Sequence, residues 1–208
     1  MSGERVLGCR TCWSARRAAA AIAVAALLSA LAACASKPAR FYTLTPAADA
    51  TSTPLAVSVS VGPISIPAIV DNSTIMVSVS QSEIHPDDFA RWASPLRDNI
   101  AHAVAGDLSA LLGSERVTLT ADTWSQTPDY RVAIEVGRFE SIPGEAASLD
   151  AFWTVRRTRD GVAREGRTTL REPTQGTDMS ALASAHSRAL ARLSEDIARA
   201  IRSLNQPG

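Results

Sequence analysis

The 208-residue chain is short of several residue types, and each shortage excludes a class of protein. Lys37 is the only lysine, and the formal net charge is zero, which is unlike a strongly basic nucleic-acid-binding protein. Four Trp, two Tyr and four Phe are too few for an obvious base-stacking surface. Three cysteines, two of them near the start, cannot build a disulfide framework. With 46% hydrophobic and 20% charged residues, what remains is an ordinary globular composition.

The clearest local signal lies at the N-terminus. Residues 1–17 carry four arginines and one glutamate, and residues 18–30 carry no charge. That uncharged run is shorter than the ~20 residues that span a bilayer, but it has the length of a signal-peptide core. It ends in Leu-Ala-Ala-Cys at residues 31–34, where small residues precede a cysteine. This segment resembles a bacterial lipoprotein signal with its lipobox, and we predict that residues 1–33 are the signal peptide. The alternative is an ordinary secretory signal followed by a coincidental cysteine.

Cys34 is the predicted site of lipidation. Its thiol would take a diacylglycerol through a thioether, and its newly exposed amine would take an acyl chain such as palmitate. Each buried methylene is worth ~0.8 kcal/mol, so two or three chains anchor stably where one would not. Ala35, in place of an aspartate, favours the outer membrane. Residues 34–40 would form a lipidated tether whose last six residues reach only ~20 Å, which keeps a domain at residues 41–208 close to the membrane.

The rest of the chain has the composition of one domain. Without residues 1–33 its net charge is about −3, and Cys34 is its only cysteine, so no disulfide can form within it. A chain of this size can bury its own hydrophobic core.

Alternating apolar residues predict half-buried strands at residues 55–61, 75–79, 117–121 and 130–136. Asp160-Gly161, between residues 149–157 and 162–170, predicts a hairpin. Two further segments are expected to be irregular. Prolines bracket residues 64–66, which excludes a regular central strand there. Residues 85–88 are interpreted as a capped loop that enters a short helix.

Two longer helices complete the predicted fold. Ser94 as N-cap and Pro95 as first residue begin an apolar stripe that Gly113 ends. A second stripe runs over residues 178–204 and is either core or partly a surface for self-association. Together these elements predict a single α/β domain with a mixed β-sheet and packed helices.

Four segments, in this order, resemble a known family. They are the lipobox, Phe-Tyr-Thr-Leu at residues 41–44, Val-Gly-Pro-Ile-Ser-Ile-Pro at 61–67, and Arg-Trp-Ala-Ser-Pro-Leu at 91–96. The chain resembles the ABC-type transport auxiliary lipoproteins, the PqiC/YmbA group. The resemblance implies a fold similar to the TolB N-terminal domain and a place on the periplasmic face of the outer membrane. It also implies MCE-domain and ABC permease partners that move lipids or other hydrophobic molecules between membranes. Residues 68–73 lack the arginine that the family often has there, so no contact of that arginine is carried over.

The sequence shows no constellation that points to catalysis or a metal. His85, His102 and His186 are scattered rather than spaced as ligands, and His186 lies on an apolar stripe as a core or interface residue. Asp87 and Asp88 would point in different directions on a helix. No nucleophile elbow or phosphate-binding loop is present. We therefore predict no enzyme, no metal and no cofactor apart from the lipid on Cys34.

Two features are candidates for contact with a partner or lipid. Trp92, just before the first long helix, either anchors that helix in the core or lies at a partner surface. The second feature is a set of hairpin arginines that could meet lipid phosphates or an acidic partner. The alternative for this set is a solvated strand face whose charges are paired internally. Its members are Arg156, Arg157, Arg159, Arg164, Arg167 and Arg171.

Two functional hypotheses follow. The first is a non-catalytic outer-membrane lipoprotein that anchors and docks the periplasmic conduit of an MCE/ABC-type lipid transport system. The alternative is a monomeric periplasmic lipid carrier with an apolar pocket of its own. Assembly into a homo-oligomer is left open, and nucleic acid is not expected as a partner.

Overall fold

A computed structural model describes residues 38–80, 82–120 and 127–206, and all of these except Pro38 belong to the folded unit Ala39–Gly208. The predicted signal peptide, Cys34 and most of the tether lie outside the described residues. The unit contains, in order, β1 (Arg40–Tyr42), β2 (Val59–Ser65), β3 (Thr74–Ser80), β4 (Glu83–Trp92), α2 (Leu96–Leu112), β5 (Val117–Leu119), β6 (Tyr130–Ile142), β7 (Ala146–Arg157), β8 (Ala163–Pro173) and α3 (Met179–Asn205).

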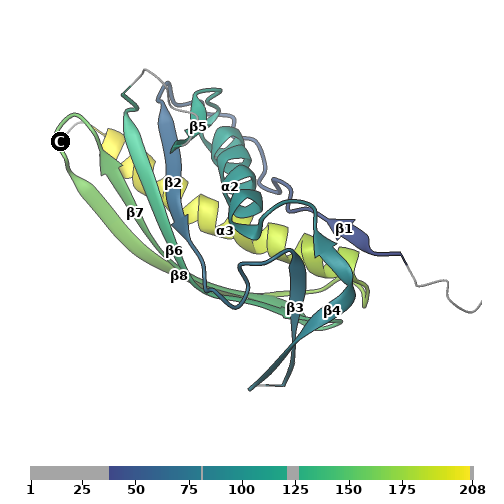
Figure 1. Ribbon diagram of the computed structural model, residues 1–208. Helices are drawn as coiled ribbons and strands as arrows, with labels where there is room; N and C mark the ends of the chain where they lie inside the picture. The colour runs from purple at the N-terminus through teal and green to yellow at the C-terminus, as the bar shows by residue number, and fades with distance from the viewer. Residues whose placement is uncertain (1–37, 81, 121–126, 207–208) are drawn as a thin grey trace, which may run out of the picture. The chain divides into compact units, whose positions relative to one another are not determined.

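The described strands form one eight-stranded mixed sheet built around β6 (Figure 1). On one side β6 pairs antiparallel with β7 along almost its whole length, and β8 follows β7 as the next strand. On its other side β6 pairs with two strands, β2 and β3. Its first half pairs in parallel with β2, beyond which lies β5, and its second half meets β3 at Ser141. Strands β4 and β1 continue the sheet from β3. The single α/β domain with a mixed sheet is confirmed.

The two faces of the sheet differ in burial. Along β6 the side chains alternate, so that Val132 and Ile134 are buried while Arg131 and Glu135 are exposed. Helices α2 and α3 pack against each other and against the buried face, with α3 in contact with β6, β7 and β8. Figure 1 shows α3 running along the sheet behind these strands. We call the other face, which carries Arg131 and Glu135, the open face.

Both long helices are confirmed, but the start of α2 differs from the expectation. Pro95, not Ser94, is its N-cap residue, and no side chain caps the helix. The Ser94 carbonyl accepts a hydrogen bond from Asn99 Nδ2 (3.0 Å). Gly113 ends α2 with a φ of 61°, the left-handed conformation that glycine adopts without strain. Helix α3 begins as expected, with Asp178 Oδ1 accepting from the Ala181 N–H (2.7 Å).

The apolar stripe of α3 is buried in the domain. Its residues belong to the core. Of the two interpretations that the sequence left open, core or a surface for self-association, the first is therefore the one that holds. They are Leu182, His186, Leu190, Leu193, Ile197, Ile201 and Leu204.

Two predicted irregular segments are strands in the structure. Strand β2 begins at Val59 rather than residue 55 and runs through Pro63, because a register shift between Val61 and Ile64 accommodates the proline. Residues 85–88 lie in β4, so the expectation of a loop and short helix is wrong. Asp87 Oδ1 accepts the N–H groups of Phe89 (2.9 Å) and Ala90 (2.7 Å), a bonding pattern that also occurs at helix N-caps.

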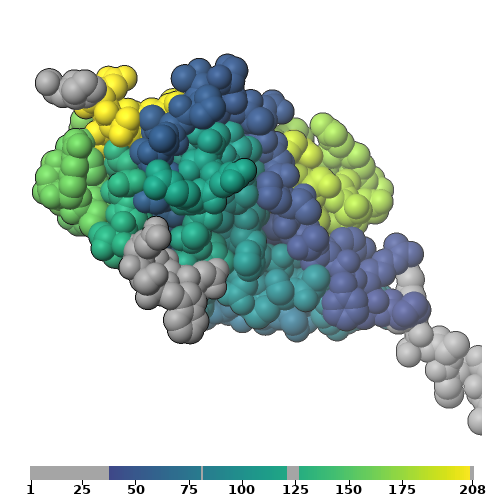
Figure 2. Space-filling view, turned by 90° about the horizontal axis from the view of Figure 1, so that it is seen from above, coloured from purple at the N-terminus to yellow at the C-terminus, as the bar shows by residue number. Residues whose placement is uncertain are grey.

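Buried polar side chains hold the N-terminal segment onto α2. Asp107 Oδ1 accepts the N–H groups of Ala47 (2.7 Å) and Ala48 (2.9 Å), and Asn99 Oδ1 accepts from Thr43 Oγ1 (2.9 Å). Burial raises the pKa of Asp107 above its usual value. In Figure 2 the purple and blue N-terminal segment lies against the teal surface of the α2 region. The irregular segment around Ala47 and Ala48 is thus held by hydrogen bonds that span more than fifty residues of sequence.

Candidate functional site

The hairpin arginines do not share one surface. In the β7–β8 ladder, Arg156 and Arg167 point to the open face, where they lie opposite Ala163 and Phe152. Arg157 and Arg164 point to the helix side of the sheet, and Arg159 lies in the turn. Alternation along the strands therefore divides the predicted contact set between two faces and a turn.

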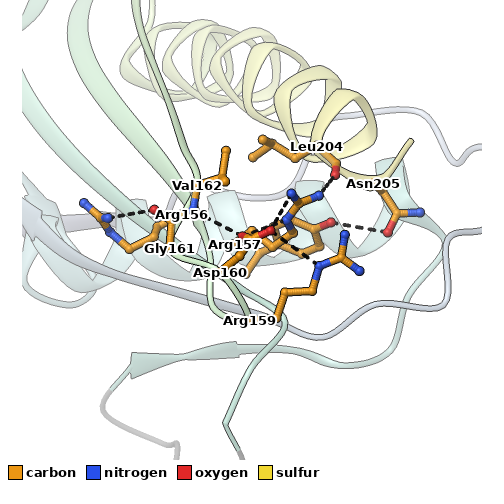
Figure 3. A network of polar contacts seen from close by, with 9 residues as sticks. Arg156, Arg157, Arg159, Asp160, Gly161, Val162, Leu204 and Asn205 are labelled. Carbon is orange, nitrogen blue, oxygen red and sulfur yellow. Dashed lines mark hydrogen bonds and ion pairs between the residues drawn. The ribbon is translucent and has the colours of Figure 1, made fainter. Parts of the chain in front are cut away.

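Arg157 holds the end of α3 in place (Figure 3). Its Nε and Nη2 donate to the two carboxylate oxygens of Asp160 (3.0 and 2.7 Å), and its Nη1 donates to the main-chain carbonyl of Leu204. The side chain is only 16% exposed, and the carboxylate beside it raises its pKa further. A cation at the last carbonyls of a helix also complements the helix dipole. These contacts assign Arg157 a structural role.

A pocket of about 300 Å³ lies beside this network. Tyr130 donates from its hydroxyl to Asn205 Oδ1 (3.3 Å) in its wall, and Asp129 accepts from the N–H and Oγ of Ser58 (2.7 and 2.8 Å). These bonds lower the pKa of Asp129. Arg159, 71% exposed and 3.8 Å from Asp160, is the cation at the rim with the most freedom to meet an anion.

On the open face the main arginine contact is also internal. Arg167 donates two hydrogen bonds to Asp150 (2.8 and 2.5 Å), and its guanidinium lies 4.8 Å above the ring of Phe152. Hydrogen bonding to Arg167 lowers the pKa of Asp150 to about 2. Phe152 remains 49% exposed. This arrangement favours the interpretation of an internally paired strand face.

The remaining arginines are less constrained. Arg156 donates to the carbonyl of Gly161 (3.0 Å), and Arg171 pairs with Glu145. Arg164 is exposed. Contact of this set with lipid or partner stays a prediction, and Arg156, Arg159 and Arg164 are the members best able to make it.

Trp92 belongs to the core, so it is not a surface contact residue. It is 4% exposed and meets the rings of Phe139 and His186 edge-on, each with its centroid 6.3 Å away. Phe139 and His186 are stacked at 4.0 Å. His186 Nε2 is 2.8 Å from Ser141 Oγ, and burial lowers the histidine pKa to about 3. Burial among aromatic rings makes His186 a core histidine.

The other polar candidates are dispersed. His85 Nε2 pairs with Glu83 (2.8 Å) on β4, and His102 lies on the exposed side of α2. Among the described residues no group of three His, Cys, Asp or Glu could hold a metal ion. The helices within the described ranges include none long and apolar enough to cross a membrane.

The sequence pattern alone does not reveal two exposed apolar side chains of the structure. Val79 (57% exposed) and Ile84 (37%) lie on the paired strands β3 and β4. This hairpin projects from the rest of the unit in Figure 1. The alternation of apolar residues at 75–79 predicts a half-buried strand, but Val79 lies near the end of the hairpin and is exposed.

Comparisons with known proteins agree with this fold. A family model described as "ABC-type transport auxiliary lipoprotein component" matches residues 42–198. Protein XCC0632 from Xanthomonas campestris, a DUF330 family protein, is 23% identical with a TM-score of 0.66 over 80% of this chain and 97% of that chain. A structure of an uncharacterized protein is 18% identical, with a TM-score of 0.64 over 79% of this chain and 99% of that chain. The search of curated proteins finds no match.

Proposed function

Since the chain belongs to the ABC-type transport auxiliary lipoprotein family, we propose that it is a non-catalytic, lipid-anchored docking component of an intermembrane lipid transport system. The observation that carries the proposal is the extent of the family match, which spans residues 42–198 and so nearly all of the folded unit. In this proposal Cys34 is the anchor at the periplasmic face of the outer membrane. The folded unit docks an MCE-domain conduit whose energy comes from a separate ABC permease.

The β3–β4 hairpin is the docking element in this proposal. Val79 and Ile84 expose apolar side chains close to its end, where burial against a partner would remove them from water. The hairpin projects from the helices, so a partner can reach it without displacing the core (Figure 1).

The pockets give the lipid-carrier alternative no support. Three pockets in the described part of the chain have volumes of about 300, 460 and 260 Å³. Pockets for drug-sized ligands already measure about 300–1,000 Å³, and a two-chain lipid is larger than such a ligand. Charged residues line all three, including Asp129, Arg164 and Glu135. A docking role therefore fits the described surface better than a carrier role.

The anchor is tested by metabolic labelling of cells that express the full chain. Wild-type protein is expected to incorporate radiolabelled palmitate and to sediment with membranes, whereas Cys34→Ser is expected to lose both properties. A wild-type chain that takes up no label, or a variant that is labelled equally, would contradict lipidation at Cys34.

The docking element is tested by site-specific photo-crosslinking in cells. A photoreactive residue at Ile84 is expected to cross-link to an MCE-domain protein. The control position is Glu115, which is exposed and just precedes β5, at the other end of the unit in Figure 1. Cross-linking to that protein from Glu115 but not from Ile84 would overturn the assignment of the hairpin.

A further inference from the structure

Strand β8 is a long edge strand. Among the described residues it pairs only with β7 and has eleven residues, whereas β1 and β5 have three each. The Arg157 N–H donates to the Val162 carbonyl (2.8 Å), which makes residues 157 and 162 a hydrogen-bonded pair. By alternation, residues 163, 165, 167, 169 and 171 of β8 turn their backbone N–H and C=O groups away from β7. Such a row of backbone groups is a template for another strand.

We propose that two copies of this chain pair through β8, antiparallel and about a two-fold axis at Thr168. Residue 167 then lies opposite 169 of the second copy, 165 opposite 171, and 164 opposite 172. Backbone hydrogen bonds can form between the two copies in this register. The odd-numbered residues, whose backbone groups point outward, lie opposite one another as hydrogen-bonded pairs. The interface is isologous, so each contact occurs twice.

The charges of β8 are complementary to themselves in this register. Arg164 lies opposite Glu172 of the second copy, and Glu165 lies opposite Arg171, which gives four cross-strand pairs of opposite charge. Moving the axis to residue 167 places Arg167 opposite itself, and moving it to residue 169 places Arg167 opposite Arg171. Like charges directly opposite are destabilising, so the pattern disfavours both neighbouring registers.

These side chains can still reach a second copy. Glu172 lies 3.6 Å from Arg188 and 3.9 Å from Arg192, longer than ordinary hydrogen bonds, so its carboxylate keeps acceptor capacity. Arg171 is paired with Glu145, but both side chains are more than half exposed and free to rearrange. Arg164 and Glu165 are exposed.

Shape supports the same register. Gly166 would lie opposite Leu170 of the second copy, on the helix side of the sheet. A pocket of about 460 Å³ is lined there by residues that include Trp153, Gly166 and Ala200. The indole lies over Gly166 so closely that a Cβ at residue 166 would be 2.2 Å from Trp153 Cζ2. The leucine of the second copy would pack at the rim of this pocket, against the edge of that indole, which is only partly buried.

The register is tested by disulfide trapping of the full chain in membranes. Arg164→Cys and Glu172→Cys are placed on chains with different tags and co-expressed under mild oxidation. In the proposed pairing they form a non-hydrogen-bonded pair with Cα atoms about 4.5 Å apart, within disulfide range. A cross-linked dimer that carries both tags is expected. Arg164→Cys expressed alone is the matched control, because its two copies lie eight residues, or ~27 Å, apart along the strands.

The wild-type chain gives the background from its own cysteines. Two results would overturn the register. Either the co-expressed Arg164→Cys and Glu172→Cys chains give no more cross-linked dimer than wild type, or Arg164→Cys expressed alone gives as much dimer as the two chains together.

The charge pattern gives a second test on full chain purified in detergent. Glu165→Arg/Glu172→Arg and Arg164→Glu/Arg171→Glu each place like charges opposite one another. In sedimentation equilibrium each variant is expected to be monomeric, wild type dimeric, and the equimolar mixture heterodimeric. Thermal melts check that both variants fold. Monomeric wild type, or variants that dimerise as strongly as wild type, would refute the interface. The result does not depend on the proposed function, because neither assay involves a transport partner.

Discussion

Acidification is predicted to destabilise the fold through His186. The ring is fully buried against Phe139, and burial lowers its pKa to about 3, whereas in the unfolded chain it is about 6.5. Above pH 6.5 the imidazole is neutral in both states and costs nothing. Below pH 6.5 the unfolded chain binds a proton that the folded chain does not bind, so the free energy of unfolding falls by ~1.4 kcal/mol per pH unit until the folded pKa is reached. Between pH 7.5 and 5.0 the expected loss is ~2 kcal/mol.

Urea unfolding at these two pH values measures this loss. The variant His186→Gln keeps a hydrogen-bonding group for Ser141 but does not titrate. We expect it to be less stable than wild type at pH 7.5 because it loses the stacked ring, yet to lose ~2 kcal/mol less than wild type on acidification. Asp107, whose pKa is raised, is present in both proteins and cancels in the comparison. An identical loss of stability in the two proteins would refute the reasoning.

Three further predictions concern single contacts. Asp107→Ala should cost ~1–3 kcal/mol in urea unfolding, because two part-buried N–H groups lose their buried acceptor, and Asp107→Asn should cost less because its amide oxygen can still accept; the reverse order would contradict this account. Arg167→Met should raise the pKa of Asp150 from about 2 toward 3.8, measured by a carboxyl NMR titration, and a pKa that stays near 2 would exclude Arg167 as its cause. Gly166→Ala should destabilise the fold by ~1–3 kcal/mol through overlap with Trp153, and unchanged stability in urea would show that the indole can move freely.

Much of the fold follows from local sequence patterns. The spacing of apolar residues predicts α3 with its start at Asp178, and Asp160-Gly161 predicts the β7–β8 hairpin. The predictions failed where the same residue type can stabilise more than one local structure. Asp87 bonds two following N–H groups as a helix cap would, yet does so inside β4. Ser94 has the identity of a cap, but its side chain does not act as one. Only the tertiary fold decides between such alternatives.

The candidate site was less predictable, because its members depend on contacts far apart in sequence. The arginines do lie on one hairpin as predicted, but the sequence pattern did not reveal which face of the sheet and which partner each side chain has. Arg157 shows the reason: its acceptor at Leu204 lies 47 residues away. Trp92 precedes α2 as expected, and its burial depends on Phe139 and His186, which come from β6 and α3.

The most direct test of the proposed role is affinity purification of the tagged full chain from separated membranes after cross-linking in cells. The account predicts that the chain is recovered from the outer membrane together with an MCE-domain protein. Recovery from the soluble or inner-membrane fraction, or from the outer membrane without an MCE-domain protein, would contradict it.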